Sequence, residues 1–184
     1  MIPVESAPYQ PCYCEENVYK LLELCDNRDG LFVVIVSNDD KAVTLWCQKS
    51  APTEMGAVIW DYHVFVIHKT GTDAKVYDQD SSLAWGVSFE QYWTNTMKAI
   101  PTFLQSERFS RKFRVIPADI YLSILSSDRS HMKNDRGEYA KPPPEWPLIN
   151  PHLPSNLMQL LRFAENFEGT EVLDEQRMVT FFST

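Results

Sequence analysis

The sequence predicts an α+β fold in which helices pack on an antiparallel sheet. The sheet is indicated by a run of β-prone residues, Val58–His68, which the turn Lys69–Thr72 connects to a second run, Ala74–Asp78. These two runs together are typical of a hairpin. Upstream, a helix is indicated by apolar residues at helical spacing, namely Val18, Leu21, Leu22 and Cys25.

The composition is that of a globular protein, and we expect residues 1–184 to form a single domain. The 184 residues, 44% of them hydrophobic, are enough for one buried core. The net charge of −8 argues against nucleic acid or an anionic membrane as a partner. No apolar run approaches the ~18 residues that cross a bilayer.

The cysteines are expected to be thiols. Residues Met1–Ser6 have neither the basic start nor the apolar core of a signal peptide. We therefore expect a reducing compartment and no disulfide among Cys12, Cys14, Cys25 and Cys47.

The predicted elements follow in order. Residues 1–11 contain three prolines and predict an irregular arm. The helix begins near Cys14, where Glu15 and Glu16 suit the helix dipole, and ends at Asp26–Gly30. Before the hairpin the pattern predicts two strands and the polar turn that joins them: Leu31–Val36, Ala42–Cys47 and Ser37–Asp40.

The second half has weaker patterns. A helix is predicted from Ser88, with Gln91 completing a capping box. Residues 127–154 are rich in proline and predict a long loop, a kind of segment that is usually functional or mobile. The remaining predictions are a strand at Lys112–Ile116 and helices at Ala118–Leu125, after Ser155 and at Val172–Phe182.

Two polar residues, Asp61 and His63, interrupt the apolar run Val58–His68. Burying a polar group costs free energy unless it finds a partner. Either both residues are satisfied structural groups, or this strand places a functional side chain in a site.

Cys14 is a candidate nucleophile because it stands at a helix start, where the dipole lowers the pKa of a thiol. Glu15 and Glu16 oppose this effect unless they point away from the sulfur. Cys12 precedes the helix and lacks the dipole's help, so Cys14 is preferred. The alternative is that Cys14 is a small buried hydrophobic residue.

The hairpin connects His63 with an acid. If its turn centres on Thr70-Gly71, His63 lies directly opposite Asp78, and their side chains share one face of the sheet. Asp78 then holds one ring nitrogen and leaves the other as a base. Nucleophile, base and orienting acid in the order Cys14, His63, Asp78 suit acyl transfer through a thiol.

Several short motifs resemble, in the same order, those of the protein N-terminal glutamine amidohydrolase family. They extend from Cys12 to Pro144 and are specific in combination; beyond Pro144, and in residues 48–57, the resemblance is loose. The motifs are Cys12-Tyr13-Cys14-Glu15-Glu16-Asn17, Trp60-Asp61-Tyr62-His63-Val64, Tyr77-Asp78-Gln79-Asp80, Arg111–Ile116, Ser127–Lys133 and the three prolines 142–144.

The resemblance implies a papain-like core, close to transglutaminases, and a single catalytic domain. It implies conversion of the N-terminal glutamine of a peptide or protein to glutamate with release of ammonia, by Cys14, His63 and Asp78 and without cofactor or metal. It further implies a role in the N-degron pathway. We expect a monomer located in the cytoplasm and also in the nucleus.

Selectivity for a free N-terminus requires an acceptor for the α-ammonium group of the substrate. The sequence does not choose among five acids, and each has a solvated surface charge as its alternative. Asparagine is shorter than glutamine by one methylene, worth only ~1–3 kcal/mol in a pocket, so we expect reach to contribute to discrimination. The five acids are Glu15, Glu16, Asp61, Asp80 and Asp128.

Three alternatives stay open at this point. In the first alternative, the same triad belongs to a transglutaminase or a thiol protease. A binding module would use the proline-rich loop to dock a partner, with the triad residues structural. A metal site is disfavoured because His63 and His68 face opposite sides of a regular strand and Cys-x-Cys is tighter than usual zinc spacing; its ligands would be Cys12, Cys14, His63 and His68.

Overall fold

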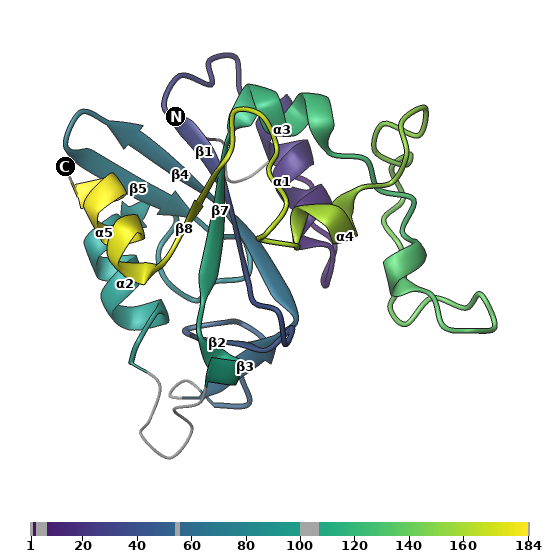
Figure 1. Cartoon of the computed structure of the whole chain (residues 1–184), viewed down its shortest axis with the longest axis horizontal. Coiled ribbons are helices and arrows are strands. Elements are labelled where there is room, and N and C mark those ends of the chain that lie inside the picture. The colour runs from purple at the N-terminus through teal and green to yellow at the C-terminus, as the bar shows by residue number, and fades with distance from the viewer. Residues whose placement is uncertain (1, 3–6, 54–55, 100–106, 184) are drawn as a thin grey trace.

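The computed structural model describes residues 2, 7–53, 56–99 and 107–183, and its centre is a six-stranded antiparallel sheet (Figure 1). The strand order is β6-β5-β4-β1-β7-β8, and β2 and β3 form a separate two-stranded sheet. The α+β class with an antiparallel sheet is therefore confirmed. The strands are β1 Leu31–Ser37, β2 Val43–Trp46, β3 Ala57–Trp60, β4 Tyr62–Thr70, β5 Asp73–Tyr77, β6 Val87–Ser88, β7 Lys112–Pro117 and β8 Glu171–Leu173.

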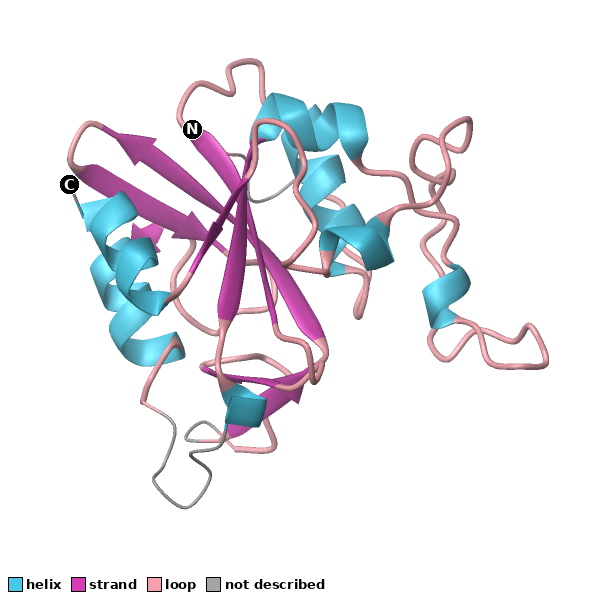
Figure 2. Ribbon diagram, in the orientation of Figure 1, coloured by secondary structure: helices cyan, strands magenta, loops and turns pink. Residues whose placement is uncertain are grey.

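Helices cover both faces of the sheet, so the molecule has three layers (Figure 2). On β1, Val33 and Ile35 face one core, whereas Val34 and Val36 face the other, as alternation along a strand requires. The first core is completed by α1 (Cys14–Glu23), α3 (Ala118–Ile124) and α4 (Leu157–Leu160), and the second by α2 (Phe89–Thr96) and α5 (Glu175–Ser183).

The predicted strand Val58–His68 is wrong in its continuity, because a bend at Asp61 divides it into β3 and β4. β3 pairs with β2, whereas β4 pairs with β1 and β5. The polar turn after β1 therefore leads into another sheet and forms no β1–β2 ladder. The chain bends at this position because Asp is disfavoured within strands.

The hairpin exists, but its predicted register is wrong by two residues. Val66 pairs with Tyr77 and Thr70 with Asp73, so the turn centres on Gly71-Thr72 and β5 ends before Asp78. A shift of two residues keeps each side chain on its face, whereas a shift of one reverses it. Asp78 consequently still projects toward His63.

Most other predicted elements are confirmed. The Ser88 side chain accepts a hydrogen bond from the Gln91 backbone N–H at 3.3 Å, which is one of the two bonds of a capping box. The C-terminal segment is a correction, because only its second part is helical and its first part is strand β8. The short strand β6 was not predicted, since two residues carry no periodicity.

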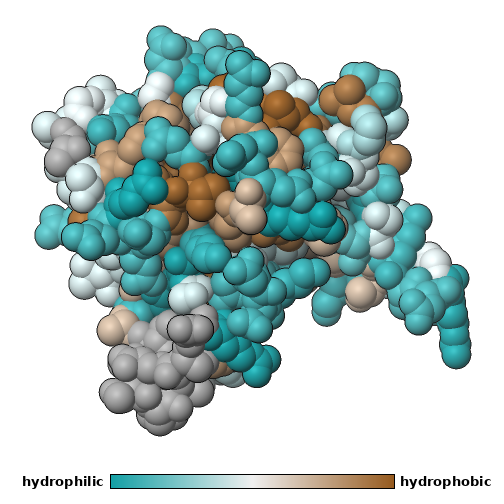
Figure 3. Space-filling model, viewed as in Figure 1, coloured by the Kyte–Doolittle hydropathy of each residue, from teal (hydrophilic) through white to brown (hydrophobic). Residues whose placement is uncertain are grey.

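The loop 127–154 contains one 3₁₀ turn, Ser130–Met132, and two isolated β-bridges, and it projects from the body of the protein (Figure 1). The face shown in Figure 3 is mostly hydrophilic, and its apolar groups form small patches. None of the helices in the described ranges is long and apolar enough to cross a membrane.

Candidate active site

A cavity of about 270 Å³ lies where the start of α1, the bend before β4 and the loop 127–154 meet. It contains two of the three predicted catalytic residues, Cys14 and His63, and two of the five candidate acids, Asp61 and Asp80. Its lining residues are Cys12, Cys14, Trp60, Asp61, Tyr62, His63, Asp80, Met132, Ala140 and Lys141.

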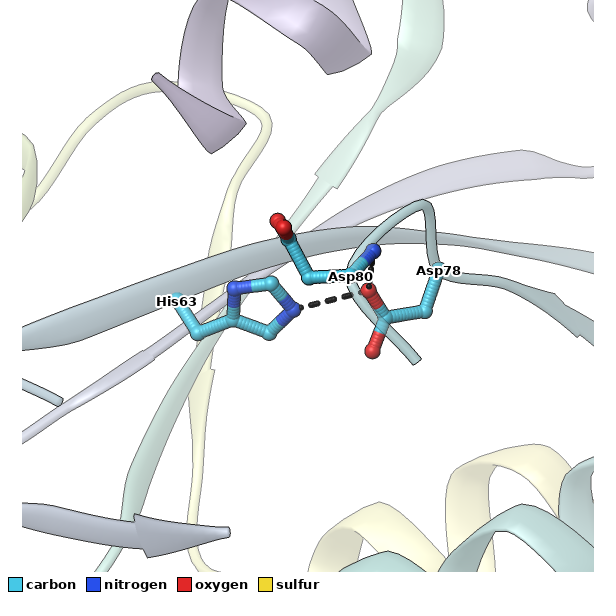
Figure 4. Close-up of side chains that lie close together, drawn as sticks. All are labelled: His63, Asp78 and Asp80. Carbon is cyan, nitrogen blue, oxygen red and sulfur yellow. Dashed lines mark hydrogen bonds and ion pairs between the residues drawn. The ribbon is translucent and has the colours of Figure 1, made fainter. Parts of the chain in front are cut away.

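His63 and Asp78 form a buried pair (Figure 4). The distance from Nε2 of His63 to Oδ1 of Asp78 is 2.9 Å. Trp60 and Phe65 stack against the imidazole, with ring centroids 6.0 and 6.1 Å away. Because Nε2 faces the acid, Nδ1 is the nitrogen that remains to accept a proton.

Asp78 is held by three groups. Besides His63, the Asp80 backbone N–H donates to Oδ1 at 2.9 Å, and the Tyr92 hydroxyl donates to Oδ2 at 2.8 Å. Sequence reasoning predicted the helix that carries Tyr92 but missed this contact. Nothing in a helical repeat shows which acid a buried tyrosine reaches.

The charges of this pair support an ionised acid beside a basic ring. Burial alone would raise the pKa of Asp78, but attraction and hydrogen bonding to His63 outweigh it and lower that pKa below its usual value. Burial would lower the pKa of His63, and Asp78 instead raises it. When the ring is neutral and its proton lies on Nε2 toward Asp78, Nδ1 is the unprotonated nitrogen.

Cys14 is the first residue of α1 and is buried. The expected lowering of its thiol pKa is wrong: burial and the charges of Glu15 and Asp80 raise that pKa well above its usual value. A backbone hydrogen bond from Val64, the neighbour of His63, acts in the opposite direction but is outweighed. The site thus starts from a thiol and needs a base to ionise it.

Glu15 explains part of this effect. Its Oε2 lies 3.9 Å from the Cys14 sulfur and accepts a hydrogen bond from the Tyr62 hydroxyl at 2.9 Å. Burial raises the pKa of Glu15 to about 8. His131 of the loop lies 3.5 Å from its other oxygen.

Glu16 points away from the sulfur and fastens the loop 127–154 to α1. Arg129 donates to both of its carboxylate oxygens, from Nε at 2.9 Å and from Nη2 at 2.8 Å. Trp146 donates from its indole N–H at 2.8 Å. We call Glu16, Arg129 and Trp146 the loop latch, because it keeps the loop residues of the cavity near Cys14.

Breaking the loop latch should destabilise the protein. Arg129→Ala leaves the buried Glu16 charge without a partner, which typically costs about 3–5 kcal/mol. We expect urea unfolding to show a loss of this size. The control is Arg162→Ala, which removes an exposed pair with Glu165 and should cost less than about 1 kcal/mol. Equal losses in both variants would show that the latch is not structural.

The metal alternative is not supported by the geometry. Cys12, Cys14 and His63 share the cavity, but His68 lines a different one beside Cys25. In the described part of the chain the four predicted ligands are thus not brought together. All four cysteines are free, as expected.

One other group of potential ligands exists among the described residues. A ring nitrogen of His63 and a carboxylate oxygen each of Asp78 and Asp80 lie within 4.8 Å of one another. Both Asp78 oxygens and His63 Nε2 already serve the hydrogen bonds of the pair, including the one from Tyr92. Hydrogen bonding is sufficient to explain the cluster.

Comparison of the sequence with known proteins identifies the family of the chain. The family model described as N-terminal glutamine amidase matches residues 9–182, well past the last motif at Pro144. A *Caenorhabditis elegans* protein named protein N-terminal glutamine amidohydrolase is 54% identical over 183 residues, covering 100% of both chains. The human protein of that name is 40% identical over 153 residues, 80% of this chain and 73% of its own.

A more distant relative agrees with these two. The *Drosophila melanogaster* protein of the same name is 38% identical over 186 residues, covering 89% of this chain and 90% of its own length. The family model matches most of the chain, and the relatives are similar to it over most of its length. The chain therefore belongs to the N-terminal glutamine amidase family.

Proposed function

We propose that this protein converts the N-terminal glutamine of peptides and proteins to glutamate and releases ammonia. The observation that carries the proposal is the cavity in which Cys14 lies with His63, whose ring is held by Asp78. The names of its relatives supply the substrate class.

The first step is attack on the side-chain carboxamide of the substrate. As His63 Nδ1 takes the proton of the Cys14 thiol, the sulfur bonds to the carboxamide carbon and the carbonyl oxygen gains a negative charge. The backbone N–H of Cys14 has no acceptor within its helix, because it is in the first turn, and it is our candidate for stabilising that oxygen.

The second half of the reaction returns the enzyme to its starting state. His63 gives its proton to the amide nitrogen, which leaves as ammonia and produces a thioester on Cys14. A water molecule, deprotonated by His63, then attacks the thioester carbon. The carbon–sulfur bond breaks, the proton returns to the thiolate, and glutamate is released. Asp78 keeps the ring oriented and stabilises its charged form.

We also propose the finer fold class, the domain and the biological setting that the motif resemblance implies. A nucleophile at a helix start, followed by a His on a strand and an Asp just after the next strand, is consistent with a papain-like core related to transglutaminases. The chain would act as a single catalytic domain and a monomer. It would supply N-terminal glutamate to the N-degron pathway in the cytoplasm and nucleus.

Mass spectrometry with ammonia detection tests the reaction. A peptide that begins with glutamine should gain the mass of an amide-to-acid exchange and release one equivalent of ammonia. The same peptide acetylated at its N-terminus, and one with only internal glutamine, should not change. Incorporation of an added amine in place of water would instead indicate a transglutaminase, and internal cleavage a protease.

A further inference from the structure

The structure distinguishes among the five acids that are candidates for binding the substrate's α-ammonium group. Glu15 and Glu16 are excluded because the first is enclosed with Tyr62 and the second is neutralised by Arg129. Asp128 accepts a hydrogen bond from the Ser130 backbone and does not line the cavity. Only Asp61 and Asp80 face the space that contains Cys14.

Asp80 already has one hydrogen-bond partner and lies close to His63. Its carboxylate accepts a hydrogen bond from the Tyr9 hydroxyl and has an oxygen within 4.8 Å of a ring nitrogen of His63 (Figure 4). His63 becomes a cation during the proposed reaction, and an ammonium group at Asp80 would lie beside that second positive charge. The resulting repulsion would oppose the proton transfer.

Asp61 has room for a cation. It lies at the bend between β3 and β4 and is exposed. Its Oδ1 accepts a hydrogen bond from the Tyr62 backbone at 3.0 Å, and no described lysine, arginine or histidine lies within ion-pair distance of it. The second oxygen is thus available to a ligand in the cavity.

The surroundings of Asp61 suit an ammonium group. Its neighbours Trp60 and Tyr62 are both aromatic and both line the same cavity. The faces of such rings attract cations, best when these are partly desolvated. An acid with a free oxygen, next to two aromatic residues that line the same cavity, provides a charge beside an apolar surface.

We infer that Asp61 binds the α-ammonium group of the N-terminal glutamine and so makes the enzyme selective for a free N-terminus. This inference rests on the proposed function and names the group of the substrate that the cavity recognises. The position is also informative: Asp61 is two residues before His63. A substrate anchored at Asp61 must reach Cys14 with its side chain, which is a reason for glutamine to be preferred over the shorter asparagine.

The test removes the charge on either side of the contact. Two substrates are compared: a glutamine-initiated peptide and the same peptide without its α-amino group. For wild type, loss of the amine should lower kcat/KM about tenfold to a hundredfold, the range for a hydrogen bond to a charged group. Asp61→Asn should lower kcat/KM for the full peptide by a similar factor and show almost no further loss with the deaminated peptide.

Two variants provide comparison. Asp128→Asn, outside the cavity, should keep the wild-type ratio between the two substrates. Asp80→Asn is expected to lower kcat through His63 but also to keep that ratio. The inference is overturned if Asp61→Asn retains the wild-type ratio, or if Asp80→Asn is the variant that loses it.

The same experiment separates this inference from the function itself. A wild-type protein that releases no ammonia from the full peptide contradicts the proposed function, and the role of Asp61 falls with it. An active wild type whose ratio is unaffected by Asp61→Asn contradicts the role of Asp61 alone. Because Asp61 is exposed, its replacement should leave the melting temperature unchanged, and thermal unfolding verifies this.

Discussion

Cys14→Ser should abolish ammonia release from glutamine-initiated peptides, with a loss in kcat of at least about 10⁴-fold. The serine hydroxyl is far less acidic than the thiol, and His63 would have to ionise it in a buried site where Glu15 and Asp80 already disfavour negative charge. The measurement is single-turnover ammonia release. A variant with near wild-type activity would rule out Cys14 as the nucleophile.

The matched control is Cys12→Ser, because Cys12 lines the same cavity two residues away. It precedes α1, has a backbone angle φ of 69° and is half-buried as a residue. We expect this variant to retain substantial activity and Cys14→Ser to fold as wild type does. An inactive Cys12→Ser beside an active Cys14→Ser would exchange the two assignments.

Asp78→Asn should lower kcat by about 10⁴-fold, as loss of the orienting acid does in other triads. An asparagine amide in place of the carboxylate favours the wrong tautomer of His63 and removes the negative charge that raises the pKa of the ring. The pH dependence of kcat/KM tests this cause directly. We expect its lower limb to move to lower pH, since the ring would lose its proton at lower pH.

Tyr92→Phe is the graded comparison for Asp78→Asn. It removes the hydroxyl that donates to Asp78 Oδ2 at 2.8 Å but keeps the acid and its bond to His63. An unsatisfied buried acceptor costs about 1–3 kcal/mol, so stability should fall while most of the activity remains. Equal loss of activity in both variants would contradict the orienting role of the charge.

The pairing of His63 with Asp78 shows how far sequence reasoning reaches at this site. The predicted register was wrong by two residues, yet the contact exists because a shift of two conserves the face of the sheet. The face of the sheet on which a side chain lies follows from the two-residue period of a strand, and this period is a local property. The register depends on the turn, and Gly71-Thr72 could not be distinguished from Thr70-Gly71 by residue type alone.

The role of Glu15 and Glu16 shows the opposite case. In the sequence both are acids in the first turn of a helix, and both were candidates for the same role. In the structure Glu16 holds Arg129 of a loop more than a hundred residues away, whereas Glu15 is enclosed beside Cys14 and has a pKa raised to about 8. Long-range packing makes this difference, and adjacent positions in a helix do not predict it.

The sequence by itself determined the α+β class, most of the helices and strands, and the three residues proposed for catalysis. These depend on local periodicity and on which residue types can serve as nucleophile, base and acid. Only the tertiary structure decided the division of the central strand at Asp61, the raised thiol pKa of Cys14 and which acid is left free in the cavity. Those properties depend on desolvation and on partners distant in the chain, which a linear pattern does not contain.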